Sequence, residues 1–242
     1  MKFLIPTAKE MKLGQPKANQ PLSVKSQAII DQLLHYDLDG LAKLYKIKTE
    51  AALKEQDRLR AIQTGEALSY SAIELFNGLM YRQIDEKTLI DGADFIQKQV
   101  FITTALYGII NATHPIQPHR LDFNCPLKVD NQSLKTYWRQ DYDQFIGQEP
   151  IISLLSSEFE QVFSKRLTQR LIKIRFHEEK NGQLKTHSTI SKKARGQFLN
   201  QVIQQQVQEL EQIKKLTFNQ FTYQPQLSDQ STLVFVKKEI KP

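Results

Sequence analysis

An antiparallel hairpin that leads directly into a helix constrains the fold of this chain most. From residue 172 to residue 177, apolar side chains alternate with basic ones, as in a strand with one buried face and one face in water. Asn181-Gly182 follows, and this dipeptide is the strongest hairpin signal in the chain. Residues 184–190 are then predicted to form the returning strand, and a helix begins directly after them.

Four other short apolar runs predict buried strands, and amphipathic segments between them predict helices. The strands are expected at residues 1–6, 100–102, 150–155 and 233–236, and the helices at 23–34, 67–80, 156–170 and from about 189 onward. The predicted fold class is α+β. We expect a single mixed domain over residues 1–242, with a central, partly antiparallel sheet surrounded by helices.

Residues 38–58 form a separate unit with a recognisable pattern. The apolar spacing predicts two short helices that meet at a tight turn at residues 45–48. A helix-hairpin-helix element of this kind binds duplex DNA by pointing the amides of its turn at phosphates, and it normally carries glycines beside the central apolar residue. Lys46 and Lys48 occupy these places. They add charge, but they lack the left-handed freedom of glycine.

The overall charge favours an anionic partner. The chain has 33 basic and 26 acidic side chains, which gives a net charge of +7. Nucleic acid, anionic lipid and phosphorylated small molecules all fit this excess. No long apolar segment, signal peptide or lipidation signal is visible, so we expect a cytoplasmic protein without membrane attachment. The single cysteine, Cys125, excludes chemistry by paired thiols.

The densest group of cations is Lys192, Lys193 and Arg195, which the pattern places on the opening turn of a helix. Thr189 and Ser191 are its candidate N-caps. The N-terminus of a helix already carries partial positive charge, so bases are unusual there and an anion is expected opposite them. The alternative interpretation is a solvated charge cluster on a surface helix.

Two further cations stand at positions suited to ligand contact. Lys9 follows the first predicted strand, and strand ends are common ligand positions in sheets with crossover helices. Arg120 lies in a proline-rich loop that exposes it for an ionic contact. His114 and His119 are separated by two prolines, so we predict no metal site. Glycine-rich phosphate loops and nucleophile elbows are also lacking, and no cofactor is predicted.

In chain order, several short motifs resemble those of the peroxide stress protein YaaA family (UPF0246). The Lys-Lys-Ala-Arg-Gly motif of the family is present unaltered at residues 192–196. The chain departs at Asn77 and Leu79, where the family commonly has Lys and Asp. The other matching positions are Pro6-Thr7-Ala8-Lys9, Gly78, Tyr81, Leu106-Tyr107-Gly108, Pro118-His119-Arg120-Leu121 and Trp138.

The resemblance implies a function and a fold. It implies a cytoplasmic DNA-binding protein of the oxidative-stress response, linked to lower free intracellular iron and to protection of DNA from hydroxyl-radical damage. It also implies a mixed α+β fold peculiar to the family, with a positively charged cleft and a helix-hairpin-helix element. Direct iron storage is not expected, because buffering iron needs clustered N, O or S ligands.

Two hypotheses about function follow. In the first, the chain is a monomer that binds duplex or branched DNA without sequence specificity, and affinity is mostly electrostatic. In the second, it is an enzyme for a phosphorylated or nucleotide-like small molecule, with Tyr107 or Glu158 transferring protons. A closed pocket of several hundred Å³ favours the enzyme, and an open groove wide enough for a duplex favours DNA.

Both hypotheses use the same residues. The predicted anion-binding residues are Lys9, Lys46, Lys48, Arg120, Lys192, Lys193 and Arg195, and the predicted supporting residues are Gly78, Tyr81, Tyr107, Gly108, Trp138 and Glu158.

Overall fold

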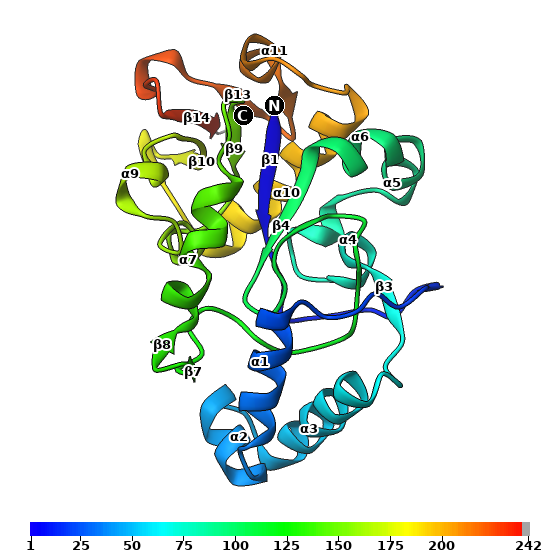
Figure 1. Ribbon diagram of the computed structural model, residues 1–242. Helices are drawn as coiled ribbons and strands as arrows, with labels where there is room; N and C mark the ends of the chain where they lie inside the picture. Colours follow the sequence, from blue (N-terminus) through cyan, green and yellow to red (C-terminus); the bar gives the residue numbers. More distant parts are fainter. Residues whose placement is uncertain (239–242) are drawn as a thin grey trace.

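The computed structural model describes residues 1–238 and is built around a nine-stranded mixed sheet (Figure 1). The strand order is β12-β13-β14-β10-β9-β1-β4-β5, with β11 paired to β10 alone. In chain order these strands are β1 (Lys2–Pro6), β4 (Val100–Thr104), β5 (Gly108–Asn111), β9 (Ile151–Ser153), β10 (Leu171–Lys180), β11 (Gln183–Lys185), β12 (Thr217–Phe218), β13 (Phe221–Tyr223) and β14 (Thr232–Lys237).

The middle of the sheet is parallel and its flanks are antiparallel. Strands β4, β1, β9, β10 and β14 are parallel to one another. On one side β5 pairs antiparallel with β4, and on the other β13 pairs antiparallel with β14. The expected mixed, partly antiparallel sheet is therefore confirmed. The predicted hairpin at Asn181-Gly182 is also present, because β11 returns antiparallel along β10. The returning strand expected at residues 184–190 is much shorter, because β11 covers only Gln183–Lys185 and residues 188–190 already belong to a helix.

Eleven α-helices surround the sheet within residues 1–238, and none of them is both long enough and apolar enough to cross a bilayer. They are α1 (Val24–Leu34), α2 (Leu38–Tyr45), α3 (Thr49–Thr64), α4 (Ala72–Leu75), α5 (Glu86–Asp91), α6 (Ala93–Gln99), α7 (Leu134–Phe145), α8 (Ser157–Glu160), α9 (Lys165–Thr168), α10 (Ser188–Gln204) and α11 (Leu210–Lys215). The remaining elements are two 3-10 helices, η1 (Tyr81–Gln83) and η2 (Pro225–Leu227), and the short strands β2 (Pro16–Lys17), β3 (Ser69–Ser71), β6 (Pro115–Ile116), β7 (Lys128–Val129) and β8 (Gln132–Ser133).

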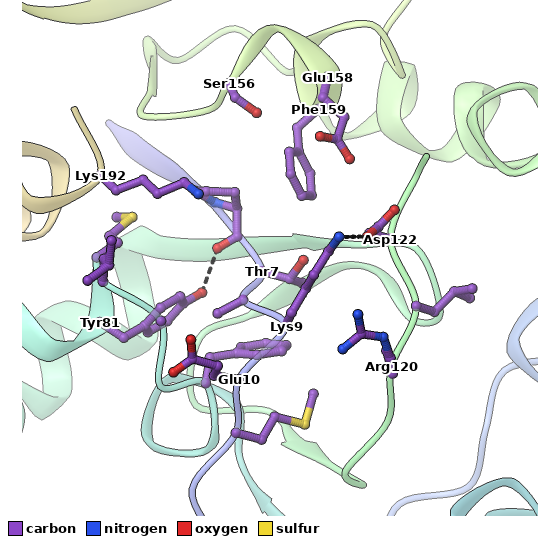
Figure 2. Close-up of a pocket in the computed structure, with 18 of the residues that line it drawn as sticks. Thr7, Lys9, Glu10, Tyr81, Arg120, Asp122, Ser156, Glu158, Phe159 and Lys192 are labelled. Atoms are coloured by element: carbon purple, nitrogen blue, oxygen red, sulfur yellow. Dashed lines mark hydrogen bonds and ion pairs between the residues drawn. The ribbon is translucent and has the colours of Figure 1, made fainter. Parts of the chain in front are cut away.

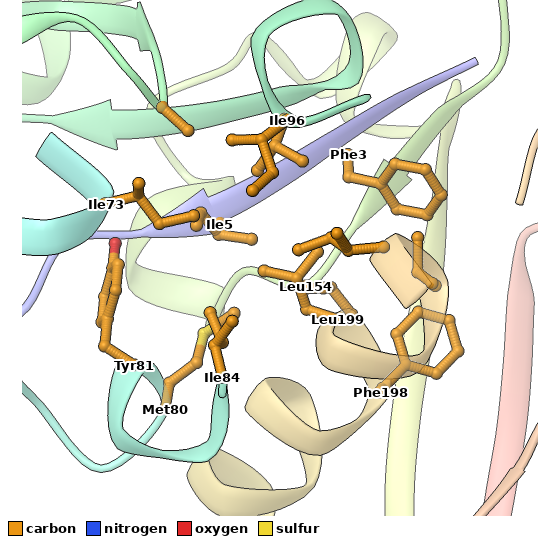
Figure 3. Packing of buried hydrophobic residues seen from close by; sticks show 14 of the residues in the cluster. Phe3, Ile5, Ile73, Met80, Tyr81, Ile84, Ile96, Leu154, Phe198 and Leu199 are labelled. Atoms are coloured by element: carbon orange, nitrogen blue, oxygen red, sulfur yellow. The ribbon is translucent and has the colours of Figure 1, made fainter. Parts of the chain in front are cut away.

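Apolar residues pack on both faces of the sheet. Successive residues of a strand point to opposite faces, and accordingly Phe3 and Ile5 belong to one hydrophobic cluster while Leu4 belongs to the other. Phe198 and Leu199 of α10 pack in the cluster of Phe3 and Ile5 (Figure 3). Helix α7 contributes to the second cluster beside the sheet, and the cluster continues from there to α1, α2 and α3. The central strands are thus covered on both sides, as parallel strands require.

Helices α1, α2 and α3 gather at one end of the molecule, away from the central strands (Figure 1). The helices expected on either side of residues 45–48 are present, and a tight turn joins α2 to α3. Lys46 ends α2 in the left-handed conformation, with φ 55° and ψ 50°, although lysine lacks the freedom of glycine. Lys48 is extended at φ −68° and precedes α3.

Two helix predictions are wrong. The segment at 67–80 is mostly not helical, because β3 occupies residues 69–71 and pairs with β2 and β6, which leaves only the short α4. The segment at 156–170 forms two separate helical turns, α8 and α9. Pairing with strands distant in sequence overrides the local apolar spacing at β3.

Candidate functional site

One pocket of about 390 Å³ lies beyond the carboxyl ends of the parallel strands β1 and β9, and we call it the strand-end pocket. The segments that directly follow these two strands form part of its wall. Ligands of open α/β sheets commonly bind at such strand ends. The lining residues are Pro6, Thr7, Ala8, Lys9, Glu10, Met11, Phe76, Gly78, Leu79, Met80, Tyr81, His119, Arg120, Leu121, Asp122, Ser156, Glu158, Phe159, Lys192 and Arg195.

Four cations from three distant segments of the chain line this pocket. Lys9 comes from the loop after β1, Arg120 from the proline-rich loop, and Lys192 and Arg195 from α10. Figure 2 shows Lys9 extending across the pocket, with Arg120 and Lys192 on opposite sides of it. The structure therefore brings together residues that the sequence separates by more than 180 positions.

Three carboxylates line the same pocket, so it is a site of mixed charge. The Nζ atom of Lys9 lies 2.9 Å from Oδ2 of Asp122. Glu10 forms an ion pair with Arg82, outside the pocket lining. With four cations against three carboxylates, the lining carries an excess of one positive charge. An incoming anion would therefore meet cations that are partly engaged already.

Glu158 is the third carboxylate, and its environment differs from that of the other two. Burial raises the pKa of Glu158, and the nearby charge of Asp122 raises it further, whereas a hydrogen bond from Asn124 lowers it. A pocket carboxyl with a raised pKa is suited to proton transfer.

Arg195 has hydrogen-bonding capacity that the protein does not use. Its Nε atom is buried and has no hydrogen-bond partner. Burial lowers the pKa of Arg195 to about 10, with a further contribution from the nearby Arg175, so the guanidinium stays charged at neutral pH. The neighbouring Glu160 accepts hydrogen bonds of 3.0 and 3.1 Å from Arg175 instead. A buried charged donor without a partner is costly, and an anion in the pocket would compensate this charge.

His119 is a neutral imidazole in the wall of the pocket. It is 3% exposed, and burial lowers its pKa to about 4. Its Nδ1 atom lies 2.8 Å from the carbonyl oxygen of Gln117. A carbonyl only accepts, so Nδ1 carries the hydrogen and Nε2 is left as an acceptor. The ring packs edge-on against Phe76 and Tyr107.

Two of the predicted supporting residues shape the floor of the pocket. The hydroxyl of Tyr81 donates a 2.7 Å hydrogen bond to the carbonyl oxygen of Pro6, at the end of β1 (Figure 2). Gly78 lies so close to the loop after β1 that a Cβ atom on it would stand 2.8 Å from Cβ of Ala8. Together they fix the path of the chain as it approaches Lys9.

The other predicted supporting residues, Tyr107, Gly108 and Trp138, are not among the residues that line the pocket. Tyr107 donates a 2.5 Å hydrogen bond to Oε1 of Gln117 and accepts one from the amide of Gln117, so it holds the segment that carries His119. Gly108 has φ 75° and lies against the ring of Trp138, whose Nε1 donates to the carbonyl oxygen of Ala105. These three residues act from behind the pocket.

The remaining predicted cations lie outside the pocket. Lys193 is exposed and does not line it. Lys46 lines a smaller adjoining hollow, and Lys48 lines an open hollow at the α2–α3 turn. Among residues 1–238, no group of three or more His, Cys, Asp or Glu side chains is placed to hold a metal ion.

The predicted start of the cationic helix is wrong. Helix α10 begins at Ser188 with His187 at its N-cap, and no side chain caps it. Thr189 and Ser191 are therefore inside the helix, and Lys192 belongs to its second turn. The helix dipole acts within the first turn. The cations contact the pocket through the side of the helix, not through its N-terminus.

Aromatic and sulfur-containing side chains complete the walls, and sequence patterns do not mark them. Phe76, Phe159 and Met11 line the pocket, and Figure 2 shows the ring of Phe159 directed into it. Phe76 and Phe159 are buried, so in the sequence they look like ordinary core residues. Phe159 and the nearby Ser156 are the exception, because they follow the strand predicted at residues 150–155 and strand ends are common ligand positions.

These features define a mixed α/β protein with a pocket of cations, carboxylates and aromatic rings at the ends of its parallel strands. The chain belongs to the peroxide stress protein YaaA family, whose model matches residues 1–227. This membership supports a role in the response to oxidative stress.

Several streptococcal relatives match the chain almost from end to end. It is 53% identical over 241 residues to the UPF0246 protein stu1967 of Streptococcus thermophilus, with 98% of each chain covered. It is 50% identical over 242 residues to a UPF0246 protein of Streptococcus sanguinis, which covers 98% of this chain and all of the relative. A UPF0246 protein of Streptococcus agalactiae serotype III, gbs2036, is 48% identical over 241 residues, with 99% of each chain covered.

Proposed function

We propose that the chain acts in the response to peroxide stress by binding an anionic, nucleotide-like ligand in the strand-end pocket. The observation that carries this proposal is the meeting of Lys9, Arg120, Lys192 and Arg195 around one cavity of about 390 Å³. Pockets for small molecules and cofactors occupy about 300 to 1,000 Å³. This volume suits a nucleotide and is too small for a duplex, so it favours the second of the two sequence-based hypotheses.

The chemistry of the walls supports a ligand with one charged and one flat apolar part. Arg120 and Arg195 present guanidinium groups, which bind phosphate oxygens in pairs of parallel hydrogen bonds. Phe76 and Phe159 supply aromatic surface, and the acceptor Nε2 of neutral His119 suits an N–H group of a base. Phosphate and base would thus each meet a matching part of the wall.

Glu158 adds a group that could transfer a proton to the bound ligand. Burial raises the pKa of Glu158, and a pocket carboxyl with a raised pKa is suited to transferring a proton to a bound ligand. Within this proposal, Glu158 is the proton-transferring group and Tyr107 is a positioning residue. The link to lower free iron is then indirect, because the chain has one cysteine and five histidines and iron buffering needs clustered ligands.

Isothermal titration calorimetry with thymidine monophosphate, deoxyadenosine monophosphate and inorganic phosphate tests the proposal. Lys192→Ala should weaken nucleotide binding about 10-fold, the effect of losing one charge-assisted hydrogen bond. The matched control is Lys193→Ala, which removes the adjacent exposed cation and should leave affinity unchanged. If no nucleotide binds at millimolar concentration, or if both variants lose affinity equally, the pocket does not bind this ligand class.

A second candidate function is DNA binding, and the hollow at the α2–α3 turn favours it. Lys46, Lys48 and Lys54 are exposed and line this hollow together with one acid, Glu50. Their position at a helix hairpin matches the element that the family resemblance implies for binding duplex or branched DNA without sequence specificity. Such binding should weaken with salt, and Lys48→Ala should reduce the log-log slope by about 1 in fluorescence anisotropy with a duplex. A response that does not change with salt would exclude this mechanism.

A further inference from the structure

The strand-end pocket carries different charges on its two sides. Figure 2 shows Lys192 on one side, with Asp122 and Glu158 across from it. Arg195 follows Lys192 by about one turn of α10 and also lines the pocket. We call the part at Lys192 and Arg195 the cationic side and the part at Asp122 and Glu158 the acidic side. A bound ligand therefore meets two different chemical environments.

The acidic side is a fixed pair of hydrogen-bond acceptors. Asn124 joins its two carboxyl groups, because its backbone amide donates a 2.9 Å hydrogen bond to Oδ1 of Asp122 and its side chain donates one to Glu158. Oδ2 of Asp122 lies 2.9 Å from Nζ of Lys9. A carboxylate offers about four acceptor positions. Both groups therefore keep acceptor capacity that a ligand can use.

The acidic side calls for neutral donors. Lys9 already compensates the charge of Asp122, so a second cation is not needed there. A phosphate on this side would be repelled by Asp122. Hydroxyl groups donate hydrogen bonds without adding charge, and they fit this environment better than an ammonium or a phosphate group does.

The cationic side suits the phosphate instead. The buried Nε of Arg195 has no hydrogen-bond partner among the described residues. The neighbouring Glu160 accepts hydrogen bonds from Arg175 and Ser153. Guanidinium groups bind phosphate oxygens strongly. A nucleoside 5′-monophosphate carries its phosphate and its free sugar hydroxyls on separate parts of the sugar, as the two sides of the pocket require.

We propose that the strand-end pocket selects ribonucleotides, with Asp122 and Glu158 accepting hydrogen bonds from the 2′- and 3′-hydroxyls while Lys192 and Arg195 bind the 5′-phosphate. This inference rests on the proposed binding of a nucleotide in the pocket, and it names the sugar that the pocket recognises. A carboxylate binds the 2′-hydroxyl of ribose in the same way in dinucleotide-binding α/β folds. Asp122 and Glu158 are then the residues that determine specificity.

Isothermal titration calorimetry of the natural chain with three adenine nucleotides tests the inference. The ligands are adenosine 5′-monophosphate, its 2′-deoxy analogue and its 2′,3′-dideoxy analogue, which differ only in their sugar hydroxyls. The deoxy analogue should bind at least about threefold more weakly than the ribonucleotide, and the dideoxy analogue at least about 10-fold more weakly, because hydrogen bonds to charged acceptors are lost.

Variants of the pocket carboxylates identify the acceptors. Glu158→Ala and Asp122→Asn should each reduce the preference for the ribonucleotide over the dideoxy analogue at least about threefold, without lowering the affinity for the dideoxy analogue. Glu10→Ala is the matched control. Glu10 also lines the pocket, but it is engaged in an ion pair with Arg82, so the preference should not change. Circular dichroism checks that each protein is folded.

The outcomes distinguish this inference from the proposal on which it rests. If none of the three nucleotides binds at millimolar concentration, the proposed function itself fails. If they bind but the deoxy or the dideoxy analogue binds as tightly as the ribonucleotide, the proposed function stands and this inference is overturned. An unchanged preference in both Glu158→Ala and Asp122→Asn would also overturn it, as would an equal loss of preference in Glu10→Ala.

Discussion

At the scale of single residues, close packing explains why the Lys-Lys-Ala-Arg-Gly motif ends in a glycine, Gly196. A Cβ atom at this position would lie 2.0 Å from the carbonyl oxygen of Met80 and 2.8 Å from Cβ of Gln83. Helix α10 therefore packs directly on the backbone around η1. This contact also fixes Lys192 and Arg195 against the strand-end pocket, because they lie on the same helix.

Gly196→Ala is expected to destabilise the fold by about 3 kcal/mol, at the upper end of the range for overpacking. The better helix propensity of alanine offsets at most about 1 kcal/mol of this loss. Urea unfolding measures the change in the free energy of unfolding. Gly14→Ala is the matched control, since no atom lies within 4 Å of its Cβ position, and it should change stability by less than about 0.5 kcal/mol. Equal stability of Gly196→Ala and the natural chain would contradict the close packing.

At the scale of elements, a variant in the turn between α2 and α3 should affect the stability of the protein and its binding of anions in opposite directions. Lys46 adopts φ 55°, a conformation that costs a residue with a side chain roughly 1 kcal/mol and that glycine adopts freely. Lys46→Gly should therefore raise the free energy of unfolding by about 0.5 to 1 kcal/mol. Under the proposed DNA binding at this turn, the same variant should bind DNA more weakly, because it removes a cation from the hollow. Thermal unfolding and anisotropy measure the two effects on one protein.

Lys48→Gly is the control for this turn, because Lys48 has an extended backbone that any residue adopts. It removes a charge without relieving strain, so its stability should not increase. If Lys46→Gly and Lys48→Gly are equally stable, the left-handed conformation of Lys46 is not the cause of a gain.

The elements that local patterns could predict are those with strong local signals. The Asn181-Gly182 turn, the cap of α1 by Ser23 and the apolar strands β1, β4, β9 and β14 all follow from short-range chemistry. Strand β3 could not be predicted, because Ser69-Tyr70-Ser71 is a strand only through pairing with distant segments. The start of α10 was misplaced for a related reason: its hydroxyl residues are typical of caps, but no side chain caps this helix.

At the scale of the whole molecule, the sequence marked the cations of the candidate site but not their partners. Lys9, Arg120 and Lys192 stood out by type and position, and the fold brings them together around one pocket. The pairing of Lys9 with Asp122 and the burial of Glu158 depend on how the loops after β1, β6 and β9 pack. Such packing has no local periodicity. The mixed charge of the pocket was therefore visible only in three dimensions.

The stability of the whole fold should depend on pH through buried histidine. The pKa of His119 falls from its ordinary value of 6.5 to about 4 because the ring is buried. Between pH 7 and pH 5 the unfolded chain takes up a proton that the folded chain refuses, so stability decreases as the pH falls. The expected loss from His119 is about 2 kcal/mol. Burial also lowers the pKa of His114 and His177, which act in the same direction.

The buried Glu55 and the half-buried Glu158 oppose this trend, and a variant at His119 isolates the contribution of the histidine. Burial raises the pKa of Glu55 and Glu158, so the folded state binds their protons first and the cost of their burial disappears as the pH falls. His119→Asn keeps an N–H donor near the carbonyl of Gln117 but does not titrate. Urea unfolding at pH 7 and pH 5 should show a clear loss of stability for the natural chain and less than half that loss for the variant. The same loss in both proteins would show that other groups control the acid sensitivity, because only His119 differs between them.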